Sequence, residues 1–116
     1  MSIPRVSNSE MSDYVCDRKA FTNTNQTCWG EWKTPEMYVV YSYGTHFPIY
    51  VWDEHMGWLA NTDKFSVTTS RHQNQAHPRA FTRRYDTADI KKIVQAGSYT
   101  KYVADRITIT PEQEAA

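Results

Sequence analysis

Apolar and aromatic residues are concentrated near the middle of the chain, in short runs that turn residues separate. Residues 37–43 read Met-Tyr-Val-Val-Tyr-Ser-Tyr, and a run this rich in β-branched and aromatic residues predicts a strand. A glycine-containing turn leads to residues 47–53, which predict the returning strand. A second turn precedes Trp58, where a third strand begins. The pattern therefore predicts a three-stranded antiparallel meander within residues 37–67.

Helical signals follow in the C-terminal half. The run Thr-Thr-Ser at 68–70 offers N-cap residues for a short helix over residues 71–77, which the next proline would stop. Thr87 would cap a second helix, whose apolar stripe ends at a glycine, Gly97, in the position that often terminates helices. A third helix is predicted over residues 98–107, with tyrosine and β-branched residues on one face.

We expect residues 1–116 to form one domain of the α+β class, because the length is typical of a single domain. It would have a small antiparallel sheet from residues 37–67 and two or three short helices from the C-terminal half. Residues 1–36 are polar and weakly periodic, so they predict a loosely packed N-terminal arm, and residues 110–116 predict a flexible tail. The chain has 8 Tyr, 4 Trp and 4 Phe, which can form a compact core because aromatic side chains bury large areas.

The chain carries no sign of a membrane segment or a secretion signal. No cationic segment followed by an apolar run begins the sequence, and no apolar stretch approaches the ~18–20 residues that span a bilayer. Cys16 and Cys28 form no Cys-x-x-Cys pair or other metal-ligand pattern. We therefore expect a cytoplasmic protein without membrane contact or cofactor.

The segment 64–78 is the least usual part of the sequence. Ten consecutive residues after Val67 are nearly all hydrogen-bond donors or acceptors. A core cannot absorb so many polar groups unless each is paired, because an unpaired buried polar group costs about 1–3 kcal/mol. A disordered tail would carry more Gly, Pro, Glu and Lys. The composition therefore predicts an ordered polar surface leaving the sheet, a common position for a binding site.

Polar and basic side chains of this segment, and of the residues that follow it, are the candidate binding residues. Arginine binds phosphate or carboxylate groups in a bidentate manner, and glutamine can contact base edges or peptide groups. The candidates are Arg71, His72, Gln73, Gln75, His77, Arg79, Arg83 and Arg84. Arg71 and Gln75 would share one face of the predicted helix. A solvated helix whose polar face only contacts water remains an open alternative.

Charge is distributed unevenly along a chain whose formal net charge is zero. Residues 1–58 contain four Lys or Arg and seven Asp or Glu, whereas residues 59–116 contain nine and six. The basic stretch 64–92 therefore permits an anionic partner, and nucleic-acid binding is our second hypothesis. The acidic first half could equally fold over the basic second half and neutralise it.

Catalytic and metal-binding patterns are weak. A hydrolase would need a nucleophile, a base and a group that orients the base. The available residues are Ser66 or Ser70, His72 or His77, and Asp63. No Gly-x-Ser-x-Gly motif is present. His46 and His55 could meet His72 around a zinc ion, but no Cys or carboxylate stands at a supporting spacing. We therefore expect no enzymatic activity and no metal.

Two motifs within Tyr38–Pro78 resemble a known group of proteins. The first is Val-Val-Tyr-Ser-Tyr-Gly-x-His-Phe-Pro-Ile-Tyr, and the second is Trp-x-x-Asn-Thr-Asp-Lys-Phe-Ser-Val-Thr-Thr-Ser-Arg-His-Gln-x-Gln-Ala-x-Pro. They are similar to segments of small proteins encoded by tailed bacteriophages, a group without an established activity. The resemblance covers about a third of the chain and implies a phage accessory protein in the cytoplasm of a bacterial host.

Our leading hypothesis is therefore a non-enzymatic, phage-type accessory protein that binds a host or phage macromolecule through the polar surface at 61–79. A protein partner is favoured, and inhibition of a host or defence protein is one such role. The alternative is a nucleic-acid-binding protein that uses the basic stretch 64–92.

Overall fold

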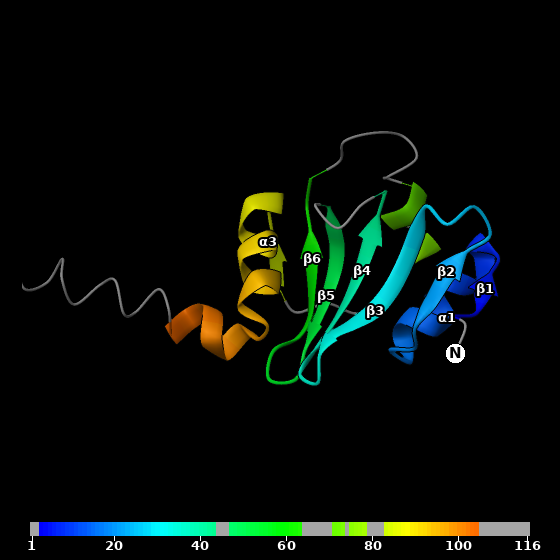
Figure 1. The fold of residues 1–116 in the computed structure, drawn as a ribbon. Helices are drawn as coiled ribbons and strands as arrows, with labels where there is room; N and C mark the ends of the chain where they lie inside the picture. Colours follow the sequence, from blue (N-terminus) through cyan, green and yellow to red (C-terminus); the bar gives the residue numbers. More distant parts are fainter. Residues whose placement is uncertain (1–2, 44–46, 64–70, 74, 79–82, 105–116) are drawn as a thin grey trace, which may run out of the picture.

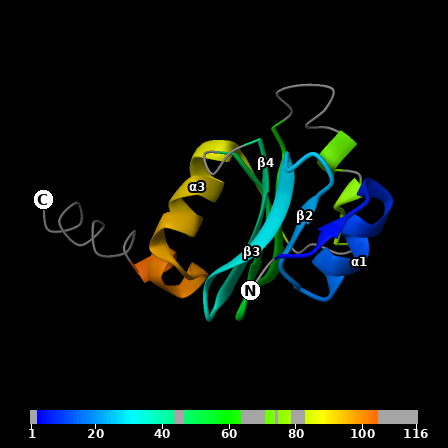
Figure 2. The same ribbon diagram turned by 45° about the vertical axis from the view of Figure 1, so that its right-hand side comes forward.

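The computed structural model describes residues 3–43, 47–63, 71–73, 75–78 and 83–104. These residues form a seven-stranded sheet in which the strands follow their order in the sequence, from β1 to β7. Figure 1 shows the curved sheet with helical segments on either side, and in Figure 2 helix α3 and helix α1 lie on opposite faces of it. The protein therefore has three layers, with the sheet in the middle.

The elements are short. The strands are β1 (Arg5–Val6), β2 (Phe21–Asn23), β3 (Cys28–Thr34), β4 (Met37–Ser42), β5 (Pro48–Asp53), β6 (Gly57–Asn61) and β7 (Arg83–Tyr85). The helical elements are the 3-10 helix η1 (Asn8–Glu10), α1 (Met11–Cys16) and α3 (Thr87–Ala96), and residues 71–73, 75 and 99–104 are also helical. Strands β2 to β6 pair antiparallel, whereas β1 joins β2 and β7 joins β6 in parallel.

The expected fold class, a small antiparallel sheet from residues 37–67 with helices from the C-terminal half, is wrong. Three strands do lie in that region, as β4, β5 and β6. The sheet continues beyond them on both sides and becomes mixed, because its outermost strands pair in parallel. Helix α1 also comes from the N-terminal half. Strands β1, β2 and β7 have only two or three residues, too few to give a periodic signal in the sequence.

Residues 1–36, where we expected a loosely packed arm, supply η1, α1 and strands β1 to β3. Phe21 of β2 is fully buried, as are Met11 and Val15, which lie four apart on α1 and therefore share one face. The polar run after β2 is a tight turn. The Asn23 side-chain oxygen accepts hydrogen bonds from the backbone N–H of Thr27 (2.8 Å) and of the residue after it (3.2 Å). The polar sequence here reflects turn formation rather than loose packing.

Two apolar clusters lie on opposite faces of the sheet. Helix α1 and the segment 71–78 cover the first cluster, which includes Tyr38 and Val40. Helix α3 and residues 99–104 cover the second cluster, which includes Val39 and Tyr41. The side chains of β4 alternate between the two clusters because successive residues of a strand point to opposite faces. Every residue of β4 is therefore buried.

A row of aromatic side chains crosses four strands on the α1 face. Trp32 pairs with Tyr38, Tyr38 with Trp52, and Trp52 with Trp58 on adjacent strands. The Trp32 ring meets Tyr38 and Trp52 edge-on at 5.6 and 5.7 Å between centroids. The Arg18 guanidinium lies 4.4 Å from the centroid of Trp52 and makes a cation–π contact. The row therefore attaches the turn after α1 to the sheet.

Helix α3 is fixed at both ends by polar contacts. Its N-cap is Asp86, whose carboxylate accepts from the backbone N–H of Asp89 (2.9 Å). The expected cap, Thr87, is the first residue of the helix instead, and its backbone N–H donates to the Asp63 carboxylate (2.9 Å). Gly97 has φ +86° and ends the helix, as the sequence predicted.

Asp53 joins the β5–β6 turn to the C-terminal helical segment. Its carboxylate is fully buried and accepts hydrogen bonds from the backbone N–H groups of His55 (2.8 Å), Met56 (3.1 Å) and Tyr99 (2.6 Å). Charge-assisted hydrogen bonds of this kind compensate the cost of burying a carboxylate. Asp53 therefore sets where the chain runs after α3.

Gly30 allows the closest approach between β3 and its neighbours. A Cβ atom at this position would overlap the hydroxyl of Tyr38 and lie 2.7 Å from Cε1 of Phe21. The Tyr38 hydroxyl cannot move freely, because it donates to the backbone oxygen of Lys19 (2.6 Å). We expect Gly30→Ala to lower the free energy of unfolding by about 1–3 kcal/mol through overpacking, as measured by urea denaturation.

The matched control for this change is Lys33→Ala in the same strand. Lys33 is exposed, so its replacement should alter the free energy of unfolding by no more than about 0.5 kcal/mol. A Gly30→Ala variant with the unfolding midpoint of the wild type would contradict the close approach.

Candidate functional site

The described part of the predicted binding segment, within residues 71–78, lies against α1, on the face of the sheet that carries the first apolar cluster (Figure 2). Arg71 is exposed, whereas His72 and Gln73 are buried, with 2% and 7% of their surface accessible. Gln75 and His77 are partly buried. The structure therefore divides the segment into side chains that reach solvent and side chains that hold it on the sheet.

The remaining candidates lie elsewhere. Arg79 is outside the described residues. Arg83 and Arg84 are exposed on β7, where they pair with successive residues of β6 and so point to opposite faces of the sheet. Lys91 lies on α3, across the sheet from Arg71. The described part of the basic stretch 64–92 therefore does not form one continuous surface.

His72 is fixed by a buried hydrogen bond. Its Nδ1 lies 2.8 Å from the hydroxyl oxygen of Ser42, and its ring packs against the ring of Tyr43 at 5.6 Å. Burial lowers the pKa of His72, and the neighbouring Arg71 guanidinium lowers it further. Ser42 is fully buried as well, so a substrate cannot reach this pair. The pair therefore holds the segment on β4.

The described residues do not assemble the hydrolase arrangement that was considered as a weak alternative. Ser66 and Ser70 lie outside them. The Asp63 carboxylate accepts from the backbone N–H of Thr87 rather than from a histidine. This backbone hydrogen bond, followed by the Thr87 side chain, lowers the pKa of Asp63.

Gln73 attaches the segment to the ends of β5 and β6. Its Nε2 donates to the backbone oxygens of Asn61 (3.3 Å) and Asp63 (2.9 Å), and its own backbone oxygen accepts from the Tyr50 hydroxyl. The buried Oε1 atoms of Gln73 and Gln75 have no hydrogen-bond partner among the described residues. An unpaired buried acceptor costs about 1–3 kcal/mol, so a donor from a ligand would be stabilising there.

Histidine and carboxylate groups come together at the other end of the sheet. His55 lies in the β5–β6 turn, far from His72, so these two histidines do not meet as the zinc site considered above would require. His46 is outside the described residues. His55 instead lies with Glu36 and Glu54, with potential ligand atoms within 4.8 Å of one another. All three side chains are exposed, and the backbone hydrogen bond from Glu54 to Glu36 (3.0 Å) explains their proximity.

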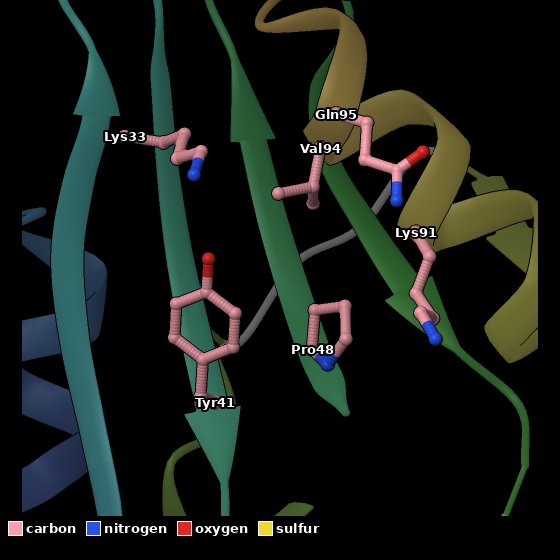
Figure 3. Close-up of a pocket in the computed structure, with 6 residues that line it drawn as sticks. All are labelled: Lys33, Tyr41, Pro48, Lys91, Val94 and Gln95. Atoms are coloured by element: carbon pink, nitrogen blue, oxygen red, sulfur yellow. The ribbon is translucent and has the colours of Figure 1, made fainter. Parts of the chain in front are cut away.

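A cavity of about 160 Å³ lies on the opposite face, between α3 and strands β3, β4 and β5 (Figure 3). Figure 3 shows Lys33 and Tyr41 on neighbouring strands, with the ammonium group and the hydroxyl directed toward each other. The lining residues are Lys33, Tyr41, Pro48, Lys91, Val94 and Gln95. The sequence analysis did not identify this site.

Two irregularities in strand pairing shape the cavity. The register between β3 and β4 shifts at Lys33, and the register between β4 and β5 shifts at Ile49, so that Tyr41 pairs with Pro48. Such bulges redirect side chains and often lie beside functional sites. Lys91 and Gln95 stand four apart on α3, the only part of the lining that a sequence pattern could have placed on one face.

The chain belongs to the DUF8033 family, a family of unknown function, whose model matches residues 9–94. The match extends from η1 through all the strands except β1 and into α3. Comparisons with curated proteins and with solved structures find no match. In the described part of the chain, no helix is long and apolar enough to cross a membrane.

The buried His72 should make stability depend on pH. Because its pKa is lowered in the folded state, the unfolded chain binds a proton below about pH 6.5 that the folded chain does not bind. The free energy of unfolding should therefore fall as the pH falls from about 6.5 through the lower pKa of the folded state. We expect His72→Gln to reduce this dependence, as measured by urea denaturation at several pH values.

His77 also has a pKa lowered by burial, so part of the pH dependence should remain in the variant. The matched variant is His55→Gln, which replaces an exposed histidine in the same way. If His72→Gln had the same slope as the wild type, the buried and uncharged state of His72 would be refuted.

Proposed function

We propose that the chain is a non-enzymatic protein that binds a protein partner through a surface formed by Tyr43, Arg71, Gln75 and His77. We call this the Arg71 surface. The observation that carries the proposal is an exposed aromatic residue, Tyr43, held in an unfavourable backbone conformation and packed on His72, which directly follows the exposed Arg71. Tyrosine and arginine are enriched among the residues that dominate binding energy in protein interfaces.

Tyr43 is unusual in two respects. It is 55% exposed, one of the few large apolar side chains of the described residues that reach solvent, and its φ of +65° lies in the left-handed region that non-glycine residues avoid. Its backbone N–H donates to the oxygen of Thr27 (2.7 Å), and its ring packs on His72. Strained residues of this kind are concentrated at functional sites, which supports a contact role for the ring.

Hydrogen bonds from three directions hold the segment that carries Arg71. His72 contacts Ser42 on β4, Gln73 contacts the end of β6, and the Ser12 hydroxyl of α1 donates to the backbone oxygen of His77. A surface fixed before binding loses less conformational entropy when a partner docks. The polar segment therefore supports recognition through its buried members as well as its exposed ones.

Gln75 supplies a polar contact point. It lies four residues after Arg71, and the backbone bond from Ala76 to His72 (2.8 Å) is the i to i−4 bond of a helical turn. The Gln75 Oε1 atom is buried and has no partner among the described residues. Because this oxygen is enclosed by the protein, a partner would contact the accessible part of the half-buried Gln75 side chain.

A protein partner fits the charge distribution better than a nucleic acid does. Arg71 and Lys91 are on opposite faces, and Arg83 and Arg84 point in opposite directions, so the described basic residues offer no single track for a phosphate backbone. The resemblance of Tyr38–Pro78 to phage proteins suggests a partner from a bacterial host or a phage, with inhibition of a host or defence protein as the corresponding role.

The test is affinity capture from bacterial lysate with the wild type and two single variants. Arg71→Ala should weaken capture of a stoichiometric protein at least tenfold, the loss of about 1.4 kcal/mol or more that an interface hot spot gives. Lys92→Ala removes the same charge from an exposed site on α3 and should leave capture unchanged. Equal capture by Arg71→Ala and the wild type would refute the surface.

Tyr43→Asn separates binding from stability. Asparagine tolerates the left-handed backbone conformation better than tyrosine does, which offsets the lost packing on His72. We expect the free energy of unfolding to change by less than about 1 kcal/mol, and capture of the partner to fall about tenfold or more. Intact capture by this variant would argue against a contact role for the ring.

Nucleic-acid binding is the alternative outcome. It would appear as oligonucleotide binding in fluorescence anisotropy that weakens steeply with salt, since each phosphate contact releases about one counterion. It would also depend equally on Arg71, Arg83 and Lys92, whereas the proposed surface contains only Arg71 of these three residues.

A further inference from the structure

We propose that the cavity between α3 and strands β3 to β5 binds the phosphoryl group of a small molecule at the Lys33 ammonium group and the Tyr41 hydroxyl, with Lys91 and Gln95 on the other side of the cavity. This site is separate from the Arg71 surface, because it lies on the opposite face of the sheet. Either proposal can therefore fail without the other.

Tyr41 provides the first reason. Only 2% of the residue is accessible, and its hydroxyl takes part in none of the hydrogen bonds among the described residues. The hydroxyl is not one of the fully enclosed unpaired atoms, so it borders the cavity. Two other buried tyrosines of the sheet are satisfied, since Tyr38 donates to the Lys19 oxygen and Tyr50 to the Gln73 oxygen. Buried tyrosine hydroxyls usually find a partner. The Tyr41 hydroxyl instead points along the cavity toward Lys33 (Figure 3), where a ligand oxygen would accept its proton.

The protonation of Tyr41 agrees with this role. Burial, with a smaller contribution from the negative charge of Glu31, raises the pKa of Tyr41 to about 12. The hydroxyl therefore stays protonated at neutral pH and acts as a donor. The Glu31 carboxylate accepts a hydrogen bond from the indole Nε1 of Trp29 (3.0 Å).

Lys33 and Lys91 provide the second reason. They come from β3 and α3, two elements far apart in the sequence, and line the same small space. Neither lysine forms an ion pair with a carboxylate of the described residues. The ion pair seen among these residues joins Lys19 to Asp17. Figure 3 shows the Lys91 ammonium group on the other side of the cavity from Lys33, so the space receives positive charge from both sides, which favours an anion.

The lining favours a phosphoryl group over a carboxylate. It contains no arginine, the side chain that pairs a planar carboxylate through two parallel hydrogen bonds. Lysine acts as a point charge and binds phosphate in many proteins. Two lysines match the double negative charge of a phosphate monoester, whose second pKa is about 6. A volume of about 160 Å³ is small beside pockets of ~300–1,000 Å³ that hold drug-sized ligands, so one such group fits.

The test is a titration of the full chain with inorganic phosphate, followed by amide chemical shifts in NMR. We expect saturable binding in the millimolar range, with the largest shifts at residues 33, 41, 91 and 95. Lys33→Gln should weaken binding about tenfold, the effect of losing one hydrogen bond to a charged group. Lys91→Gln should weaken it less, because it removes a charge from the other side of the cavity. Lys92→Gln is the matched control, because it removes the same charge from the exposed side of α3 and should leave binding unchanged.

Tyr41→Phe separates a loss of phosphate binding from a loss of folding, because melting temperature and binding are both measured on the same variant. It removes a hydroxyl that makes no hydrogen bond among the described residues, so the melting temperature without phosphate should change little, while phosphate binding weakens about fivefold. Phosphate should also raise the melting temperature of the wild type more than that of this variant.

Four results would overturn the proposal. The first is a linear response to phosphate without saturation. The second is an equal loss of binding in Lys91→Gln and Lys92→Gln, which would indicate unspecific attraction by net charge. The third is acetate binding as tight as phosphate binding. A single-stranded oligonucleotide that shifts the same residues while phosphate does not would also contradict it, since a small-molecule phosphoryl group would then not be the ligand.

Discussion

Burial of strand β4 on both faces is the constraint on which the rest of the structure depends. Its six residues are all inaccessible, and their side chains alternate between two apolar clusters. An apolar strand of this kind is stable only if both faces of the sheet are covered. The N-terminal half supplies α1 for one face, and the C-terminal half supplies α3 for the other. The two proposed sites lie on opposite faces for the same reason.

The C-terminal end of β4 connects these sites through three consecutive residues. The hydroxyl of Tyr41 lies in the cavity under α3, Ser42 holds His72 on the other face, and Tyr43 reaches solvent. Alternation along the strand sends neighbouring side chains to different layers. One short segment therefore orders both the cavity and the Arg71 surface, although neither site is visible as a motif in the sequence.

The sequence predicted those parts of the fold that local chemistry determines. Strands β4 to β6 have continuous β-branched and aromatic runs, and α3 has an apolar stripe that ends at Gly97. The outer strands could not be predicted, because their pairing depends on tertiary contacts and because two or three residues are too few to show the alternation of apolar and polar residues. The roles of His72 and Gln73 were hidden for a similar reason.

The partners of those two side chains lie ten to thirty residues away along the chain, at Asp63, Asn61 and Ser42. A polar residue that is buried and paired over such a distance has the same local sequence signature as one in solvent. The cavity is the hardest feature to predict from the sequence, because Lys33 comes from the acidic half of the chain and Lys91 from the basic half. Only the packing of α3 on the sheet brings them together.

The short outer strands have a consequence for how the protein behaves in concentrated solution. Strands β1 and β7 have two and three residues, and β7 exposes the charged side chains of Arg83 and Arg84. Long, flat and apolar sheet edges recruit further strands from other molecules and start aggregation. The described edges of this sheet present few backbone groups for such pairing, and the arginine charges of neighbouring molecules repel each other. This geometry disfavours growth of the sheet from one molecule to the next.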